Sequence, residues 1–183
     1  MTIKRVSDPS EIIGIKDLQT SNLKSLLTED EIQKEGFVTA EYTLAFLERM
    51  NGIEPSIIAV DGDRVVGYAL VATKALYGAH DLLDDLFRQI NLLTFKGVSL
   101  QESNYVVVGQ LCVAKSHRGQ GIAQKMYDFY RQELSDRYTY LITDVVDQNP
   151  RSVKAHLKAG FEIIGSLDYG GSRWFIVLWD WNG

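Results

Sequence analysis

The chain has 183 residues, of which 45% are hydrophobic, and this is enough for one domain with a sizeable core. Its net charge of −5, with lysine and arginine scattered along the sequence, argues against nucleic acid as the main partner. The one cysteine cannot form an internal disulfide, and neither a charged-then-apolar leader nor an 18-residue apolar run is seen. We therefore expect a soluble, cytoplasmic protein with no membrane partner.

The first third of the chain is expected to form a strand and two helices. A short strand over residues 2–6 is followed by a helix-start signal at Asp8. Residues 28–37 are acidic and are interpreted either as a solvated loop or short helix, or as one wall of a pocket for a cationic substrate. Thr39 is expected to cap the next helix. The buried stripe of that helix would be Leu44, Leu47 and Met50.

An antiparallel hairpin is predicted over residues 56–73, where two β-rich runs flank an Asp-Gly-Asp turn. The following residues 74–104 carry a one-sided apolar stripe at helical spacing, formed by Leu82, Leu83, Leu86, Phe87 and Ile90. A connection of this length is usually functional. It would either cover an acceptor site or form a homodimer contact, and the sequence does not choose between them.

Residues 106–123, VVVGQLCVAKSHRGQGIA, combine an apolar run, two glycines and a helix start. The β-branched run suits a strand buried on both faces. Gly119 and Gly121 lack the Cβ atoms that would keep another group away from the backbone. The helix that follows points its N–H groups and its positive dipole end at the same place. Together these features predict an anion site, and phosphate is the usual occupant of such sites.

Two nucleotide-binding motifs fit this loop poorly. A P-loop needs Lys followed by Ser or Thr where Ile122 and Ala123 stand. A dinucleotide fingerprint needs a third glycine where Gln124 stands, with the glycines directly after the strand. A strand–helix turn that uses its glycines for geometry alone is the remaining alternative.

The last third is predicted to alternate between helices and strands. A helix over residues 122–134 precedes an apolar strand over residues 140–146. Asn149 and the proline after it open a further helix that ends before Gly160. Two strands, over residues 161–167 and 174–179, complete the chain. The buried stripe of the first of these helices would be Ile122, Met126, Phe129, Tyr130 and Leu134.

Two motifs resemble a known family. Arg118-x-x-Gly121-x-Ala123, after a strand ending Leu111-Cys112-Val113, resembles the acyl-CoA loop of the GNAT superfamily of N-acyltransferases. Asn149-x-x-Ser152-x-x-x-His156-x-x-x-Gly160-Phe161 resembles its downstream pattern, with histidine where tyrosine is commoner. The motifs lie in the right order within residues 106–167. The resemblance implies an α/β (α+β) fold: a GNAT-like mixed sheet of about six to seven strands, helices on both faces, and central strands splayed for the cofactor.

The resemblance also implies how the chain is organised. It implies one domain over residues 1–183, with an acceptor-site region over about 10–104 and an acetyl-CoA-binding core over about 105–167. The strand backbone would pair with the pantetheine arm, the loop N–H groups would hold the pyrophosphate, and Arg118 would add charge nearby. Asn149 would bond the pantetheine arm, a role that competes with helix capping. The implied acetyl-CoA-binding residues are Leu111, Cys112, Val113, Arg118, Gly119, Gln120, Gly121, Ile122, Ala123, Gln124, Asn149 and Ser152.

Attack of an amine on a thioester needs a base, an oxyanion donor and a proton for the leaving thiolate. A backbone N–H near Val113 would meet the oxyanion. In the resemblance the thiolate donor stands at His156, where an imidazolium, or the single N–H of the neutral ring, would donate. Asp144 is the candidate base, whereas Gln110 could only orient a water. Cys112 is rejected as a nucleophile because it lies in an apolar strand.

The sequence thus predicts an N-acetyltransferase that moves an acetyl group from acetyl-CoA directly to a primary amine of a small molecule or amino acid. A protein lysine or N-terminal acetyltransferase is one alternative, and a non-catalytic acyl-CoA sensor is another. A nucleotide-binding domain is disfavoured by the missing third glycine, and no ligand spacing supports a metal site. The acceptor pocket would be walled by residues 28–41 and 74–104. Their acidic residues, which favour a cationic acceptor, are Glu29, Glu31, Asp81, Asp84 and Asp85.

Overall fold

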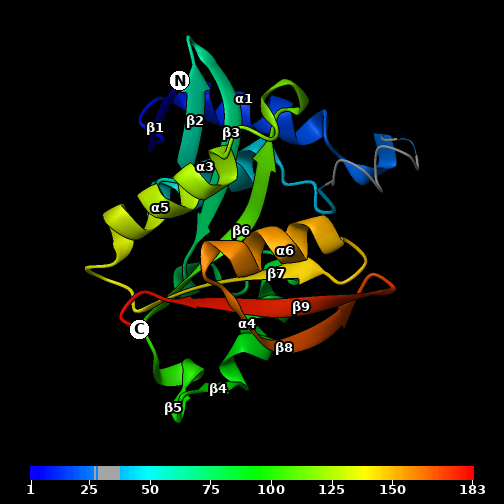
Figure 1. Cartoon of the computed structure of the whole chain (residues 1–183). Helices are drawn as coiled ribbons and strands as arrows, with labels where there is room; N and C mark the ends of the chain where they lie inside the picture. Colours follow the sequence, from blue (N-terminus) through cyan, green and yellow to red (C-terminus); the bar gives the residue numbers. More distant parts are fainter. Residues whose placement is uncertain (27, 29–37) are drawn as a thin grey trace. The chain divides into compact units, whose positions relative to one another are not determined.

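The computed structural model describes residues 1–26, 28 and 38–183. The predicted acidic stretch, including Glu29 and Glu31, therefore lies outside the described residues except for residue 28. The chain divides into two units, Met1–Ala72 with Val108–Gln132, and Thr73–Val107 with Glu133–Gly183 (Figure 1). Strand β6 (Tyr105–Val113) runs from the second unit into the first. Seven strands follow the order β1-β2-β3-β6-β7-β9-β8, which confirms the expected mixed sheet.

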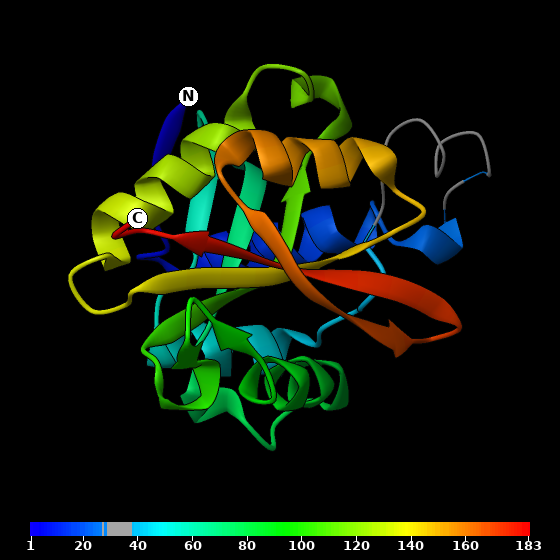
Figure 2. The ribbon, with the colours of Figure 1, turned by 60° about the horizontal axis from the view of Figure 1, so that its bottom comes forward.

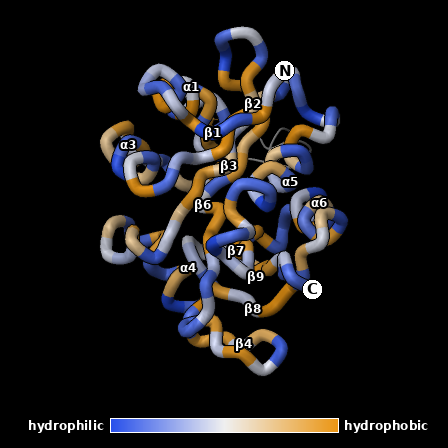
Figure 3. The backbone as a smooth tube through the Cα atoms, turned by 90° about the vertical axis from the view of Figure 1, so that its left-hand side faces the viewer, coloured by the Kyte–Doolittle hydropathy of each residue, from blue (hydrophilic) through white to orange (hydrophobic). Residues whose placement is uncertain are grey.

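The sheet of the first unit is built around the predicted hairpin. Strand β2 (Ile57–Asp61) pairs antiparallel with both β1 (Thr2–Arg5) and β3 (Arg64–Ala72). Gly62, at a φ of 58°, makes the tight turn between β2 and β3. Nearly every residue of β3 is buried, so this strand lies at the centre of the core of the unit. Helices α1 and α3 lie on one side of these strands and α5 on the other (Figure 3).

Helix α1 (Pro9–Thr20) begins where Asp8 predicts. Asp8 and Glu11 form a reciprocal capping box that satisfies two backbone donors of the first turn. Gly14 allows α1 to approach β3 closely, because a Cβ there would lie 2.8 Å from Cγ2 of Val65. The buried face of the helix contains a polar residue, Gln19, besides its isoleucines and leucine.

The predicted start of the next helix was wrong. Helix α3 (Leu44–Ile53) is capped by Thr43, whose side chain accepts a hydrogen bond from the backbone N–H of Phe46, and not by Thr39. Residues 40–42 are not helical, because their backbone groups bond side chains of α1 and β6 instead. As a result Leu44 is exposed, while Leu47 and Met50 are buried as predicted.

Helix α5 (Ile122–Leu134) follows the two glycines and confirms the expected helix. Its buried stripe contains Tyr127, whereas Phe129, which the sequence placed there, is only half-buried. Ile122 contacts the sheet near Gly67, where a Cβ would lie 3.4 Å from Cγ2 of Ile122. The missing side chain of Gly67 therefore lets α5 pack against β3.

The second unit holds the carboxyl-terminal strands. The parallel ladder between β6 and β7 (Tyr140–Val146) pairs residues 105–107 with residues 140–142, and β7 then continues fully paired with β9 (Ser172–Asp180). Strand β8 (Glu162–Tyr169) pairs with β9 at the edge of the sheet, across a turn at residues 170–171. Helix α6 (Pro150–Ala159) lies on one side of β7 and β9, and α4 (Asp81–Asn91) on the other (Figure 2).

The predicted helix in residues 74–104 is α4, which buries Leu83, Leu86, Phe87 and Ile90. A small hairpin that was not predicted follows it, with strands β4 (Thr94–Phe95) and β5 (Val98–Ser99). Lys96 and Gly97 make its turn with φ values of 47° and 82°. Within the described part of the chain, no helix has both the length and the apolar character needed to cross a membrane.

Candidate functional site

The loop between β6 and α5 has the geometry of an anion site. Arg118 is extended, whereas Gly119 and Gly121 have φ values of 78° and 74°, which favour glycine. A Cβ on either glycine would meet nothing within 4 Å, so open space lies beside this backbone. The first-turn N–H groups of α5 have no acceptor within the helix and carry its positive dipole end. The loop and the start of α5 both belong to the first unit, so this unit by itself offers a place where a phosphate group can bind.

The Arg118 side chain is directed toward the protein. Its Nε donates to the carbonyl of Val113 at 3.0 Å, and its Nη2 donates to Oδ1 of Asn22 at 2.7 Å. These bonds connect the loop to the end of β6 and to the residues that follow α1. Arg118 therefore fixes the shape of the loop whether or not it also meets a phosphate.

Cys112 is buried in β6 and has the properties of an inert thiol. Burial raises its pKa to about 11, and the attraction of the Arg118 guanidinium offsets this only in part. A thiol of that pKa is almost entirely protonated at neutral pH, and the thiolate is the nucleophilic form. This agrees with the rejection of Cys112 as a nucleophile.

Gln110 is bound by protein groups through both atoms of its amide. Its Oε1 accepts from Nε2 of Gln19 at 2.9 Å and from the hydroxyl of Tyr68 at 2.6 Å. Its Nε2 donates to the carbonyl of Ala40 at 2.8 Å. Three of the four hydrogen bonds that the amide can make are thus used inside the protein. This leaves little capacity for the water-orienting role that the sequence suggested.

Gln19 and Tyr68 were missed by the sequence analysis. Both are fully buried, and Tyr68 lies on β3 with its pKa raised well above the usual value, chiefly by desolvation. Gln19 follows Ile12 and Ile15 at the spacing of a buried helix face. A polar residue at such a core position was the available signal, because buried amides need partners.

In the second unit, His156 lies on α6 with its ring almost completely buried. Its Nδ1 is 2.8 Å from the carbonyl oxygen of Ser152, and its ring packs edge-on against Phe161. A carbonyl can only accept, so Nδ1 carries the hydrogen. Burial lowers the pKa of His156, although this hydrogen bond opposes the effect. The neutral ring thus has its only N–H committed to Ser152, and Nε2 is the ring nitrogen that carries no hydrogen.

Asp144 lies on β7 opposite Ile176 of β9. Burial raises the pKa of its carboxyl from 3.8 to about 6, and a hydrogen bond from its own backbone N–H reduces the shift. At neutral pH the group is mostly ionised but more basic than an ordinary aspartate. Such a carboxylate suits a general base.

Asn149 caps α6 as predicted. Its Oδ1 accepts from the backbone N–H of Ser152 at 3.1 Å, and Gly160 ends the helix at a φ of 105°. Capping uses the oxygen of the Asn149 amide, so its nitrogen keeps the capacity to donate to a ligand. The predicted site residues thus fall into two groups, the strand end and loop in the first unit and Asp144 with α6 in the second.

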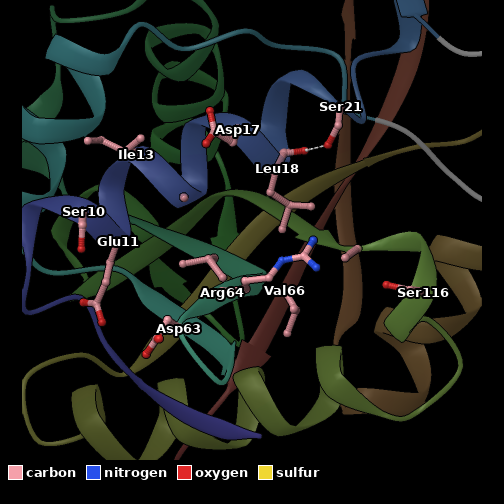
Figure 4. A pocket seen from close by; sticks show the side chains of 13 residues that line it. Ser10, Glu11, Ile13, Asp17, Leu18, Ser21, Asp63, Arg64, Val66 and Ser116 are labelled. Carbon is pink, nitrogen blue, oxygen red and sulfur yellow. Dashed lines mark hydrogen bonds between the residues drawn. The ribbon is translucent and has the colours of Figure 1, made fainter.

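A groove of about 390 Å³ lies in the first unit between α1 and the start of β3. Glu11, Asp17, Asp63 and Ser116 line it with Arg64, whose side chain reaches into the middle of the group (Figure 4). Glu11 is already occupied by Lys4 and by the capping box. The groove therefore has charges of both signs, most of them on exposed side chains.

The acidic residues of α4 have local roles. Asp84 accepts from the backbone N–H of Gly78 at 2.8 Å, and Asp85 pairs with Arg88 at 2.9 Å. Asp81 and Asp84 lie in the first turn, where negative charge complements the helix dipole. Among the residues that the structure describes, no group of three or more His, Cys, Asp or Glu is arranged to hold a metal ion.

Comparison with known proteins gives one sequence family and many similar folds. The model of the "Acetyltransferase (GNAT) family" matches residues 21–161. No curated protein matches the sequence. Arabidopsis thaliana NAA60 in complex with acetyl-CoA is 14% identical, with a TM-score of 0.68 and 98% of each chain covered.

Two bacterial structures are similarly close in fold. The putative acetyltransferase yncA from Salmonella typhimurium, with its cofactor acetyl-CoA, is 15% identical at a TM-score of 0.65, covering 100% of this chain and 95% of that one. The ribosomal-protein-alanine N-acetyltransferase from Brucella melitensis is 17% identical at a TM-score of 0.63, covering 98% and 99%. At these identities the likeness concerns the fold.

Proposed function

Since the chain belongs to the acetyltransferase (GNAT) family, we propose that it transfers an acetyl group from acetyl-CoA directly to a primary amine of a small molecule or amino acid. The observation that carries the proposal is the loop of Gly119 and Gly121. Its left-handed glycines, open surroundings and helix N-terminus fit a pyrophosphate. The solved structures of NAA60 and yncA, which contain acetyl-CoA, support the choice of this donor.

Under this proposal the donor is held by backbone and amide groups. The N–H groups of residues 119–124 hold the pyrophosphate, and the backbone of residues 111–113 pairs with the pantetheine amides as a neighbouring strand would. Asn149, with its oxygen committed to the cap, donates its amide hydrogen to the pantetheine arm, and Ser152 keeps the turn beside it small. Arg118 adds positive charge near the pyrophosphate and stabilises the loop through its hydrogen bond to the carbonyl of Val113.

In the proposed reaction the amine nitrogen forms a bond to the acetyl carbon and the carbon–sulfur bond breaks. A backbone N–H near Val113 stabilises the oxyanion. Asp144 accepts the proton that the substrate ammonium must lose before it can attack, which its raised pKa of about 6 favours. After attack the nitrogen loses a second proton, which passes to the thiolate through Nε2 of His156, because Nδ1 is committed to Ser152. The protons balance, since one remains on Asp144 and the other reaches sulfur.

Acetylation of a protein lysine or N-terminus is the second candidate. It is favoured by one specific observation, the fold likeness to a protein called ribosomal-protein-alanine N-acetyltransferase. A non-catalytic acyl-CoA sensor is the third candidate, because histidine stands where the family more often has tyrosine.

Two measurements test the proposal. Calorimetric titration should show micromolar binding of acetyl-CoA and of CoA, and far weaker binding of ADP, which lacks the pantetheine arm. Thiol release from acetyl-CoA should then be followed with glycine, lysine, spermidine and a tetrapeptide with a free N-terminus. Release with the free amines supports the proposal, and release with the peptide alone supports the second candidate. Binding without release supports the sensor, and absence of CoA binding overturns all three.

A further inference from the structure

The last turn of α1, residues 38–42 and strand β6 are joined by a network of buried and partly buried hydrogen bonds in the first unit. Nε2 of Gln19 donates to Gln110 at 2.9 Å, and Oε1 of Gln19 accepts from the backbone N–H of Tyr42 at 2.9 Å. Gln110 donates to the carbonyl of Ala40 at 2.8 Å. The hydroxyl of Tyr42 donates to the carbonyl of Gly109 on β6 at 3.3 Å.

The same segment is also fixed at its other end. The backbone N–H of Val38 donates to the carbonyl of Asn22 at 3.1 Å, and the backbone N–H of Lys24 donates to the carbonyl of Val38 at 3.0 Å. Lys16 donates to the carbonyl of Tyr42 at 2.9 Å. Residues 38–42, which we call the strap, are thus held between α1 and β6 by hydrogen bonds to both.

Packing alone does not explain why Gln19 and Gln110 stand where α1 meets β6. Gln19 is fully buried, and an apolar residue there would continue the apolar face of α1 without a desolvation cost. Amides instead demand partners at fixed positions, and a satisfied buried network specifies a single arrangement. Gln110 provides the central acceptor, because Gln19 and Tyr68 both donate to its one oxygen.

The strap ends beside the proposed site. Gln110 directly precedes residues 111–113, whose backbone is proposed to pair with pantetheine. The strap belongs to the part of the chain proposed to wall the amine pocket. The network therefore joins the proposed wall of the pocket to the strand proposed to hold the thioester.

We propose that Gln19 and Gln110 are positioning residues that hold the strap against β6 and so determine how well the amine acceptor is bound. This inference rests on the proposed acetyl transfer. It differs from a direct catalytic role, since neither amide exchanges a proton with the substrate. It also differs from cofactor binding, because Gln19 and Gln110 are not among the residues proposed to bind acetyl-CoA.

The test uses the full chain with Gln110→Met, which keeps the side-chain length and removes the amide. Hydrogen exchange at residues 38–42 should become about tenfold faster or more, because the partners of the strap are lost. For the amine in the panel that the wild type acetylates fastest, KM should rise about tenfold. The dissociation constant for acetyl-CoA should stay within about twofold of the wild-type value, because its proposed ligands are untouched.

The matched control is Asn51→Leu, which removes another buried amide of the first unit. Asn51 donates to the carbonyl of Leu47 and accepts from the N–H of Ser56, each at 2.8 Å, and neither bond involves the strap. It should lower overall stability without accelerating exchange at the strap selectively or raising the amine KM. Tyr68→Phe, which removes one donor to Gln110, should give a smaller change of the same kind and serves if Gln110→Met does not fold.

A double-mutant cycle completes the test. Gln19→Met should reproduce the effects of Gln110→Met, and the double variant should be no worse than the worse single one, because both amides act through one network. If hydrogen exchange at the strap is unchanged in Gln110→Met, the network does not hold the strap in place, and this holds whether or not any amine is acetylated. Faster exchange with an unchanged amine KM overturns the positioning role. If the wild type acetylates no amine, the proposed function and the positioning role both fall, while exchange still reports on the strap.

Discussion

Replacing Asp144 with asparagine is expected to stabilise the protein at neutral pH while slowing acetyl transfer. Burial raises the pKa of this carboxyl from 3.8 to about 6, so the folded chain holds the proton more tightly than the unfolded chain. The advantage to the folded state is complete below the unfolded pKa of 3.8 and is lost as the pH rises through 6. A shift of about two units corresponds to about 3 kcal/mol. Because the residue is partly exposed, solvent screening reduces the expected gain to about 1–3 kcal/mol.

Urea unfolding at pH 8 and pH 4.5 measures this effect. At about pH 8 the variant should be more stable than the wild type by about 1–3 kcal/mol, and at about pH 4.5 the difference should fall to about a third of that. Asp168→Asn, at an exposed position of β8, is the control and should change stability by less than about 0.5 kcal/mol at either pH. Equal unfolding midpoints at pH 8 would show that the Asp144 carboxylate is solvated in the folded chain, and the reasoning would fail. Wild-type turnover in the variant would exclude Asp144 as the base.

Four further outcomes are expected. The kcat/KM of the wild type should fall about tenfold per unit below about pH 6 as Asp144 becomes protonated, and a profile flat to pH 5 would contradict this. His156→Ala should lower turnover about tenfold to a hundredfold with acetyl-CoA affinity nearly unchanged, as kinetics and calorimetry together would show. Gly121→Ala, strained at a φ of 74°, should weaken acetyl-CoA binding about tenfold, whereas the control Gly52→Ala in α3 should not. Cys112→Ala should keep wild-type turnover, and a large loss would restore the rejected thiol.

Where the sequence predicted the fold well, the signal was local. Gly160 must take a left-handed φ at the end of α6, and Asn149 caps the same helix through a neighbour three residues away. Such contacts lie within a few residues, so their residue types report on them directly. Thr39 had the same signal but failed, because the backbone groups after it are taken by Gln19 and Gln110 from distant elements. Propensity at a helix start is weaker than several such bonds.

In the candidate site too, local features could be predicted from the sequence and long-range contacts could not. Gly119 and Gly121 make the loop predictable from the sequence, because few other residues adopt its left-handed backbone conformation. The side chain of Arg118 was less accessible to prediction, since its bond to Asn22 joins residues 96 positions apart. The Gln110 network depends on a partner 91 positions away, Gln19, and on Tyr68. Long-range polar contacts of this kind leave only a polar residue at a core position as their trace. The cytoplasmic location and the homodimer stay predictions.

The hydrogen bond of His156 changes how its proposed role must be understood. A tyrosine hydroxyl begins with a proton that it can give to a thiolate. A neutral imidazole whose Nδ1–H is committed to the carbonyl of Ser152 begins with none to give, and its lowered pKa keeps it neutral at physiological pH. Nε2 must therefore first gain a proton, and the amine is the group in this reaction that loses one. Under the proposed function, histidine at this position is a relay from nitrogen to sulfur, so turnover should not decline at alkaline pH through ionisation of this residue.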